Sequence, residues 1–483
     1  MICKNKIKGW YVAVLAIILL TARLQTVSAQ GLAHATLRLG RPKFRISPDF
    51  SGLSFEMKTL LPGQTGKHFF RPSNVALIQL FKTLGIRCLR VGGNTADLAS
   101  VAIPDDADID SLFGFAKAAD VKVIYTLRLR GAVHVRRNAQ IARYIMRHYS
   151  RQLLCFAIGN EPNLYDHQFG KYRRLWSKYT QAILRVAPEA KFDGPSSTGD
   201  GRWAVDFLKA FGHNPHVILL TQHTYVGGSA WKVKSPPLGR TELLSSQMEE
   251  KYRQFNSEFG LIAEKAHMAF RLEETNSFYN GGAKNVSDTF ASALWGLDYM
   301  WWWAKAGCNG LNFHTGNWVA AGPRLTRCRY AVFWTVPDGI SVHPLGYAME
   351  AFNIAAHGEF VPVHIQTRRT IDMTAYGAAA RDGSIYVTMI NKTHGETARN
   401  IQVSLDAGPQ YVRARAMALR VPSGRAAAKS GVKLGGGSFN RNGQWKGTWK
   451  SLNELKSRGV WHVLLPHTSA MILRLMPTQA AQR

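Results

Sequence analysis

The chain has 483 residues, of which 46% are hydrophobic and 19% are charged. This composition excludes a disordered or fibrous protein, and the length predicts a large domain of roughly 250 to 300 residues with a smaller partner domain. The formal net charge is +30 at pH 7, which favours anionic substrates or surfaces. The basic residues are scattered and no nucleic-acid-binding motif accompanies them, so we expect no nucleic-acid partner.

The N-terminus has the pattern of a secretory signal. Three lysines precede an apolar run from Trp10 to Leu20, and small residues follow up to Ala29. We therefore expect residues 1–29 to be removed and the protein to be exported, either periplasmic or secreted. The apolar run is short for a bilayer, so we expect no stable membrane span after cleavage. An uncleaved anchor is the alternative.

The charge of the mature chain suggests its partner. Residues 1–29 hold four basic and no acidic residues, so their removal lowers the net charge from +30 to +26. For an exported protein this predicts an acidic oligosaccharide or polysaccharide as substrate. A basic surface without a dedicated partner is the alternative. The oligomeric state is left open.

The mature chain alternates short strands with helices, the pattern of a (β/α)8 barrel. A strand within residues 30–47 is expected to join a β-sandwich, and residues 48–350 are expected to form the catalytic barrel. The eight predicted barrel strands are Phe50–Met57, Cys88–Gly93, Lys122–Leu129, Leu154–Asn160, Phe192–Ser197, Val217–Tyr225, Ala266–Glu274 and Gly310–Thr315.

From residue 351 the pattern changes to alternating strands with Gly and Pro turns, which predicts an antiparallel β-sandwich over residues 351–476 and a flexible tail over 477–483. Cys88 and Cys155 lie in apolar runs and are expected to be buried thiols. Cys308 and Cys328 could form a disulfide, and the sequence leaves this open. No cluster has metal-ligand spacing, so we expect neither a metal nor another cofactor in the chemistry.

Polar residues collect where the predicted strands end, the face of a barrel that holds active sites. Two glutamates stand out there. Glu161 follows Asn160 at the end of the fourth strand, and Glu274 ends the seventh. Two carboxyl groups that flank one bond are what glycoside hydrolysis needs. The alternative is a capping role at strand or helix ends. Glu273 is a rival, but strand alternation predicts that only one of the two neighbours enters the barrel mouth.

Several motifs resemble the heparanases and bacterial β-glucuronidases of glycoside hydrolase family 79. They are Gly159-Asn160-Glu161-Pro162, the run from Glu274 to Gly282, Val286 to Phe290, Leu89 to Asn94, Gln222 to Tyr225, Asn312 to Gly316 and Ile390 to Lys392. The resemblance covers nearly the whole mature chain. It implies a retaining mechanism with Glu161 as acid/base and Glu274, in place of Glu273, as nucleophile.

The same resemblance implies that the substrate is a β-linked glucuronic acid. The side chains that it implies for the sugar subsite are Glu56, Asn94, Asn160, Tyr225, Tyr279 and His314. The family reads the uronate carboxylate with a tyrosine and backbone amides in the loop after the eighth strand. Here Arg329 precedes Tyr330, and Arg324 and Arg327 lie nearby. Arginines suit carboxylates, so Arg329 and Tyr330 are expected to bind the substrate; a solvated basic loop is the alternative.

Three other functions remain open at this point. One is an endo-acting, heparanase-like polysaccharide hydrolase, and another is a hydrolase of neutral β-glycosides on the same barrel. The third is a non-catalytic protein that binds acidic polysaccharide. Two intact carboxylates disfavour the last, because a pure binder gains little from burying them.

Overall fold

The computed structural model describes residues 32–131, 134–321, 324–367, 371–452, 455–457 and 459–478. The predicted signal peptide, residues 1–29, and residues 479–483 of the predicted tail lie outside this range. Within it, no helix combines the length and the apolar character needed to cross a bilayer.

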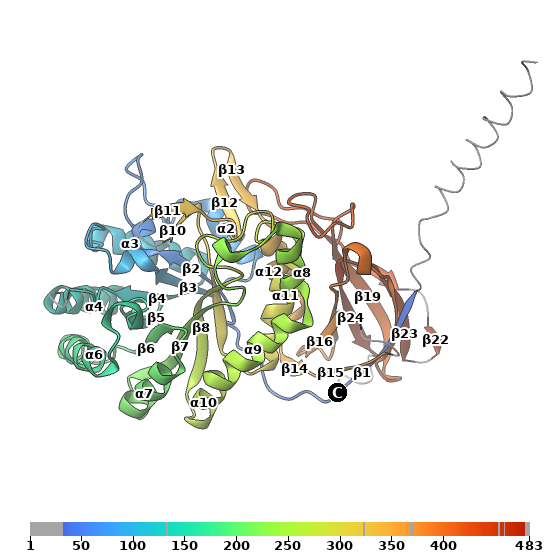
Figure 1. The fold of residues 1–483 in the computed structure, drawn as a ribbon, viewed down its shortest axis with the longest axis horizontal. Coiled ribbons are helices and arrows are strands. Elements are labelled where there is room, and N and C mark those ends of the chain that lie inside the picture. The colour runs from blue at the N-terminus through green and yellow to red at the C-terminus, as the bar shows by residue number, and fades with distance from the viewer. Residues whose placement is uncertain are drawn as a thin grey trace, which may run out of the picture.

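The predicted combination of a (β/α)8 barrel with a mainly antiparallel sandwich is confirmed (Figure 1). Eight strands close the barrel in chain order, and the last pairs in parallel with the first. They are β2 (Ser51–Glu56), β3 (Cys88–Gly92), β4 (Lys122–Leu127), β5 (Leu153–Ile158), β6 (Phe192–Thr198), β7 (Val217–Tyr225), β8 (Ala269–Asn276) and β9 (Gly310–His314). Most of their residues are buried, as expected for a parallel sheet covered on its outer face.

Helices surround the barrel. They are α2 (Val75–Thr83), α3 (Asp106–Ala119), α4 (Val135–Tyr149), α5 (Asn163–Asp166), α6 (Phe169–Leu184), α7 (Gly201–Phe211), α8 (Pro236–Leu244), α9 (Ser246–Glu258), α10 (Gly260–Lys265), α11 (Phe290–Lys305) and α12 (Pro344–Ala355). Local sequence explains their starts. Asp105 caps α3 by accepting from the backbone of Ala107 and Asp108, and Pro236 and Pro344 begin α8 and α12.

One predicted barrel strand begins later than expected. β8 starts at Ala269, whereas the sequence pattern favoured a start at Ala266. Ala266 instead caps α10, and His267 adopts a left-handed backbone conformation that turns the chain into the strand. The apolar pattern there continues through the helix end, so periodicity alone does not separate the two elements.

Two sheets form the second domain. One has the order β15 (Val363–Thr367), β1 (Ala33–Leu39), β18 (Ile401–Asp406), β23 (Val460–Leu465) and β22 (Leu455–Ser457). The other has the order β14 (Glu359–Val361), β16 (Met373–Ala379), β17 (Ile385–Asn391), β24 (Ser469–Pro477), β19 (Tyr411–Arg420) and β20 (Lys433–Leu434), with β21 (Lys450–Leu452) paired to β19. The one departure from the antiparallel pattern among the described pairs is β1, which runs parallel to β18.

Helix α11 lies between the barrel and the sandwich (Figure 1). Its residues from Phe290 to Ala304 are all buried, which explains why the helix can carry the aromatic run from Tyr299 to Trp303. Trp301 stacks on Tyr376 of β16 at 5.8 Å. Lys392, beyond β17, is buried and donates to Asp298 of α11 at 3.0 Å and to Glu249 of α9 at 2.8 Å. A buried cation thus links the two domains.

The loop after β9 carries two hairpins: β10 (Trp318–Ala321) with β11 (Arg324–Arg327), and β12 (Phe333–Val336) with β13 (Gly339–Val342). The open question of a disulfide is answered here. Cys308 and Cys328 are both free and buried in separate clusters, and the Cys308 thiol donates to backbone carbonyls of Phe270 and Gly310. Cys88 and Cys155 are also free and buried.

Candidate active site

A cavity of about 720 Å³ opens at the carboxyl ends of the barrel strands. Of the ten side chains that the sequence analysis placed in the site, nine line it. They are Glu56, Asn94, Asn160, Glu161, Tyr225, Glu274, Tyr279, His314 and Tyr330. Arg329 is not among the lining residues. Its backbone N–H donates to the carbonyl of Gly281 at 2.6 Å, which holds the loop that carries Tyr330 against the segment after β8.

Glu161 stands at a sharp turn directly after β5. Its backbone has a φ of 48°, in the left-handed region, and its N–H donates to the carbonyl of Ser196 at 2.9 Å. A glutamate rarely adopts this conformation, so the neighbouring strand end must hold it there. The turn directs the carboxyl group into the cavity, where its side chain is 14% exposed.

Glu274 lies on β8 between two hydrogen-bond donors and a nearby histidine. The Tyr225 hydroxyl donates to it at 2.8 Å, and Arg90 of β3 donates to its other oxygen at 2.6 Å. His314 lies 3.7 Å from the same oxygen. Burial alone would raise the pKa of Glu274, but the charges of His314, His223 and Arg90 outweigh it and lower the pKa to about 2. This carboxylate is therefore ionised at neutral pH.

Glu274 lines the cavity and Glu273 does not, but strand alternation is not what separates them. Between β7 and β8 the register slips, so that Gln222 pairs with Leu272 and His223 pairs with Glu274. Glu273 is the extra residue of this bulge, and a bulge breaks the alternation of side chains along a strand. Both glutamates consequently join one network: Glu273 is fully buried and lies 3.8 Å from Arg90.

His223 connects Glu273 to the acid/base candidate. Its Nδ1 lies 3.1 Å from Glu161, and its Nε2 lies 3.1 Å from Glu273. Burial would lower the pKa of His223, but the bonds to Glu161 and Glu273 prevail and raise it to about 9. An imidazolium can donate to one carboxyl oxygen of each glutamate at once, so this geometry suits the charged form of His223 and leaves the second oxygen of Glu161 free to carry a proton.

Arg90 is the central cation of the mouth. It is fully buried, and besides Glu274 it donates to Asn160 at 2.7 Å and to Ser54 at 3.2 Å. Asn160 in turn donates to Asn94 at 3.3 Å. Although burial opposes its charge, Glu273 and Glu274 raise the pKa of Arg90. A buried guanidinium that is bonded on several sides fixes the relative positions of β3, β5 and β8.

Glu56 is held at the end of β2. It accepts from the backbone and hydroxyl of Thr95 at 2.9 and 2.7 Å and from the backbone of Ala320 at 3.0 Å. These bonds and nearby His314 outweigh burial and lower the pKa of Glu56. Gly93 has a φ of 64°, and a Cβ there would meet the Glu56 carboxylate at 2.5 Å. Glycine is thus required beside Glu56.

The three arginines after β9 have different surroundings. Arg327 lies 3.7 Å above the ring of Trp334 and 5.6 Å from that of Trp318, a cation–π arrangement that occupies its guanidinium. Arg324 is exposed on β11. The arginine that lines the cavity is Arg130, after β4, which stands near the ring of Tyr165.

Ligand atoms of Glu161, His223 and Glu274 lie within 4.8 Å of one another, so this trio could hold a metal ion. Both ring nitrogens of His223 already contact carboxylates. A metal would have to displace one of those contacts, because a ligating nitrogen cannot carry a proton.

Sequence reasoning did not single out Arg90, Glu273 as a partner of His223, or Arg130. A signal was present for Arg90: a charged residue inside the apolar run from Cys88 to Val91 is costly unless it is paired. The bulge at Glu273 and the place of Arg130 depend on contacts between distant strands, which carry no local sequence pattern.

No family model matches the chain. A curated protein named beta-glucuronidase from Aspergillus niger is 24% identical over 195 residues, which is 34% of this chain and 35% of that protein. The chain thus matches about a third of the length of this relative.

Solved structures match more of the chain. A 4-O-alpha-L-rhamnosyl-beta-D-glucuronidase from Fusarium oxysporum aligns with a TM-score of 0.71 at 17% identity, over 91% of this chain and 99% of that one. A GH51 arabinofuranosidase from Xanthomonas axonopodis pv. citri aligns with a TM-score of 0.66 at 13% identity, over 92% and 100%. At these identities the structural likeness establishes the fold alone, a (β/α)8 barrel with an attached sandwich.

Proposed function

We propose that the protein is a retaining glycoside hydrolase, with Glu274 as nucleophile and Glu161 as acid/base. The observation that carries this proposal is the spacing of the two side chains, which bring oxygens within 4.8 Å of each other across the cavity. Retaining enzymes hold their carboxyl groups about 5 to 5.5 Å apart, whereas inverting enzymes need roughly 6.5 to 9.5 Å to admit a water. The observed spacing supports a direct attack on the sugar.

The surroundings of the two residues suit different roles. Glu274 is ionised and faces Tyr225 and Arg90, as a nucleophile must be before it attacks the anomeric carbon. Glu161 donates a proton to the leaving oxygen in the first step and removes one from water in the second. His223 holds Glu161 in place and, at its other nitrogen, is held by the buried Glu273.

We propose a β-linked glucuronic acid as the sugar that is cleaved. The relative from Aspergillus niger and the structural neighbour from Fusarium oxysporum, which are named as glucuronidases, support this choice. Tyr330 lines the cavity, and burial raises the pKa of its phenol well above the usual value, so it remains a hydrogen-bond donor. We expect Tyr330 to bind the uronate carboxylate, in a loop that the backbone N–H of Arg329 fastens to the carbonyl of Gly281.

The Arg130 side of the cavity is assigned to the leaving group. Arg130 follows β4, next to the strand that carries Glu161, and it lines the cavity together with Tyr165 and Leu164. Because Glu161 protonates the leaving oxygen, whatever lies beyond that oxygen is on the Glu161 side. We therefore expect Arg130 to meet an acidic group on the leaving portion of a polysaccharide.

The test compares aryl β-D-glucuronide, β-D-glucoside and β-D-xyloside and follows the product by NMR. We expect turnover of the glucuronide in excess of the others, with the β-anomer formed first and mutarotation afterwards. The α-anomer as first product would exclude the retaining mechanism, and preference for the glucoside or xyloside would exclude the acidic sugar.

A neutral pentoside is the second candidate, because the arabinofuranosidase from Xanthomonas axonopodis has the same fold over nearly its whole chain. An aryl arabinofuranoside in the same assay distinguishes it from the glucuronide.

A further inference from the structure

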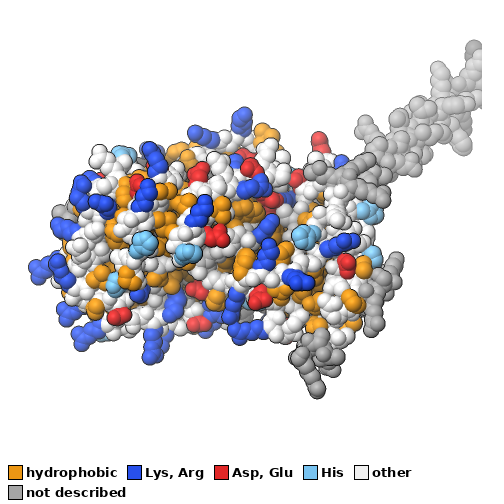
Figure 2. All heavy atoms as spheres, turned by 90° about the horizontal axis from the view of Figure 1, so that it is seen from below, with side chains coloured by type: hydrophobic (Ala, Val, Ile, Leu, Met, Phe, Trp, Pro, Cys, Tyr) orange, Lys and Arg blue, Asp and Glu red, His pale blue; other side chains and the backbone are white. Residues whose placement is uncertain are grey.

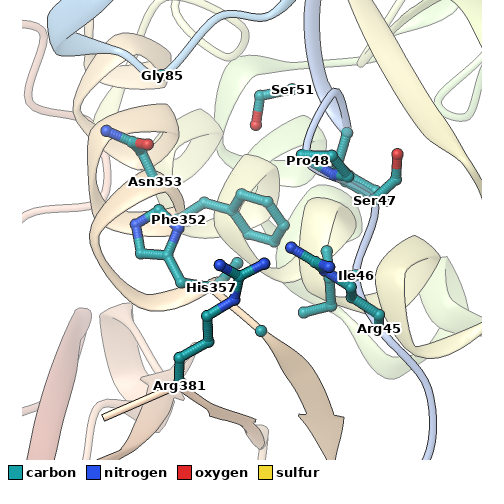
Figure 3. Close-up of a pocket in the computed structure, with 13 residues that line it drawn as sticks. Arg45, Ile46, Ser47, Pro48, Ser51, Gly85, Phe352, Asn353, His357 and Arg381 are labelled. Carbon is teal, nitrogen blue, oxygen red and sulfur yellow. The ribbon is translucent and has the colours of Figure 1, made fainter.

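A second pocket, of about 310 Å³, lies at the floor of the barrel, where the strands begin (Figure 3). It is made by both domains. Ser51 at the start of β2 and Phe352 of α12 come from the barrel side, Arg381 comes from the turn between β16 and β17, and Arg45 comes from the segment between β1 and β2. Its volume is at the lower end of the range of about 300 to 1,000 Å³ for small-ligand sites.

Three basic side chains converge on this pocket. Figure 3 shows the guanidinium groups of Arg45 and Arg381 reaching toward one another from opposite walls, with His357 beside them. Neither arginine forms an ion pair or side-chain hydrogen bond with a described residue. Both side chains are exposed, so water screens their repulsion, and an anion between them could contact both guanidinium groups.

The nearby acidic groups do not supply that anion. Asp49, Glu359 and Asp382 are neighbours in sequence, but none lines the pocket, and Asp382 is bonded to Arg474. Glu350 is bonded to Asn353, and burial raises the pKa of Glu350 to about 8, so it is neutral at pH 7. Partial burial and the charge of Arg87 hold the pKa of His357 below its usual value. The local field is therefore positive.

A buried hydroxyl also points into the same space. Ser51 is 6% exposed, and its hydroxyl has no hydrogen-bond partner among the described residues. In Figure 3 this hydroxyl is directed into the pocket. Ser51 thus adds an unused hydrogen-bond donor to the wall of the pocket that Arg45 and Arg381 also line, and donors of this kind bind oxyanions in proteins.

We propose that this pocket binds one oxyanion, a sulfate or the carboxylate of a single acidic sugar, between Arg45 and Arg381. The site lies at the opposite end of the barrel from the candidate catalytic cavity and is independent of the proposed function. It would anchor the protein to an acidic glycan without taking part in hydrolysis.

The test titrates the full mature chain with sodium sulfate and, separately, with sodium glucuronate, while NMR follows the ring protons of His357. His357→Gln identifies the resonance. Sodium chloride at matched ionic strength is the control for screening of the field. We expect sulfate or glucuronate, and not chloride, to raise the pKa of His357 until the response saturates. The anion that saturates the response at the lower concentration shows whether the pocket prefers a sulfate or a sugar carboxylate.

The double variant Arg45→Gln, Arg381→Gln should weaken this binding about tenfold to hundredfold, the effect of losing charge-assisted bonds. The matched control is Arg413→Gln, Arg415→Gln, which removes the same charge from exposed positions on β19 and should bind as the parent does. Equal weakening in both double variants, an equal response to chloride, or no saturable response would overturn the site. Ser51→Ala, which removes only the hydroxyl, provides a second test if the double variant misfolds.

Discussion

At the mouth of the barrel, Arg90, His223 and His314 each lie within reach of at least two carboxylates. At the floor, Arg45 and Arg381 face one another, and no carboxylate among the described residues lines their pocket. The two histidine environments differ accordingly. The carboxylates around His223 raise its pKa to about 9, while burial and Arg87 lower that of His357. Carboxylates thus favour the protonated form of the histidine at the mouth, whereas burial and the charge of Arg87 both disfavour it at the floor.

This contrast has a chemical consequence. The mouth offers compensated charges in fixed geometry, which is what a reacting sugar needs from a preorganised site. The floor offers uncompensated cations, which can bind an anion but provide no acid, base or nucleophile. Figure 2 shows that Lys and Arg are also spread widely over one face of the molecule, in excess of Asp and Glu. The compensated mouth is therefore the exception on a generally basic protein.

The largest expected effect comes from removing a reacting carboxylate at the mouth. Glu274→Ala should lower kcat on an aryl glucuronide by about 10⁴-fold or more, because no nucleophile remains. Glu161→Ala should retain the first step on an activated leaving group, which needs little proton assistance, and should respond to added azide. Glu264→Ala, at an exposed position on α10, is the control. Full activity of Glu274→Ala, or labelling of Glu273 by a fluorinated inhibitor, would refute the assignment.

The next prediction concerns stability and compares a buried arginine of β3 with an exposed arginine just before it. Arg90→Met leaves Glu273 and Glu274 buried without their central partner, so the free energy of unfolding should fall by about 3 to 5 kcal/mol. Arg87→Met, just before β3, removes an exposed pair with Asp120 and should cost about 0 to 1 kcal/mol. Urea unfolding measures both. Equal losses in the free energy of unfolding would show that the buried ion pairs of Arg90 do not stabilise the mouth.

The sequence predicted the barrel and most of the site because strand ends concentrate polar residues on one face. Glu161, Glu274 and His314 are all recognisable as polar residues that end apolar runs. Glu273 does not line the cavity, as expected, but the alternation argument that kept it out does not hold. Strict alternation holds only while the register does, and the slip opposite His223 is a contact between two strands. The pairing of β1 with β18 joins residues far apart in sequence and leaves no local pattern either.

The floor pocket was not foreseen for a related reason. Arg45, His357 and Arg381 come from three separate segments, and each reads in the sequence as one more scattered basic residue. Only the docking of the sandwich on the barrel brings them together.

The pH dependence of stability should also differ between the ends. His223 has a folded pKa of about 9 against an ordinary value of 6.5, so its stabilising contribution is present below pH 6.5 and is lost as the pH rises through 9. The contribution is on the order of 3 kcal/mol. His223→Gln should remove this alkaline loss in urea unfolding.

At low pH the carboxylates limit stability. Glu273 and Glu274 have pKa values lowered from 4.5 to about 2, so their contribution is present above 4.5 and is lost as the pH falls through 2. His357→Gln should not change the loss of stability at high pH, because the pKa of His357 in the folded protein lies below the ordinary value. An alkaline loss that persists in His223→Gln would assign it to another group.

The smallest effects should come from side chains that contact acidic groups of the substrate without reacting. Tyr330→Phe tests the sugar side and should lower kcat/KM about tenfold for the glucuronide, with little change for the glucoside, which has no carboxylate to bind. Arg329→Ala is expected to change neither much, because the Arg329 side chain does not line the cavity. Arg130→Ala tests the leaving-group side. Because Arg130 is exposed, the substitution should lower kcat/KM by up to about tenfold only when the leaving portion is acidic, and the loss should shrink at high salt.

Arg327→Ala is the matched control. The Arg327 guanidinium lies against Trp334, so its removal should lower stability and leave the preference for acidic leaving groups unchanged. If Arg130→Ala instead impairs neutral aryl glucuronides as strongly as acidic oligosaccharides, then Arg130 contacts the cleaved sugar itself, and the two sides of the cavity must be assigned in reverse.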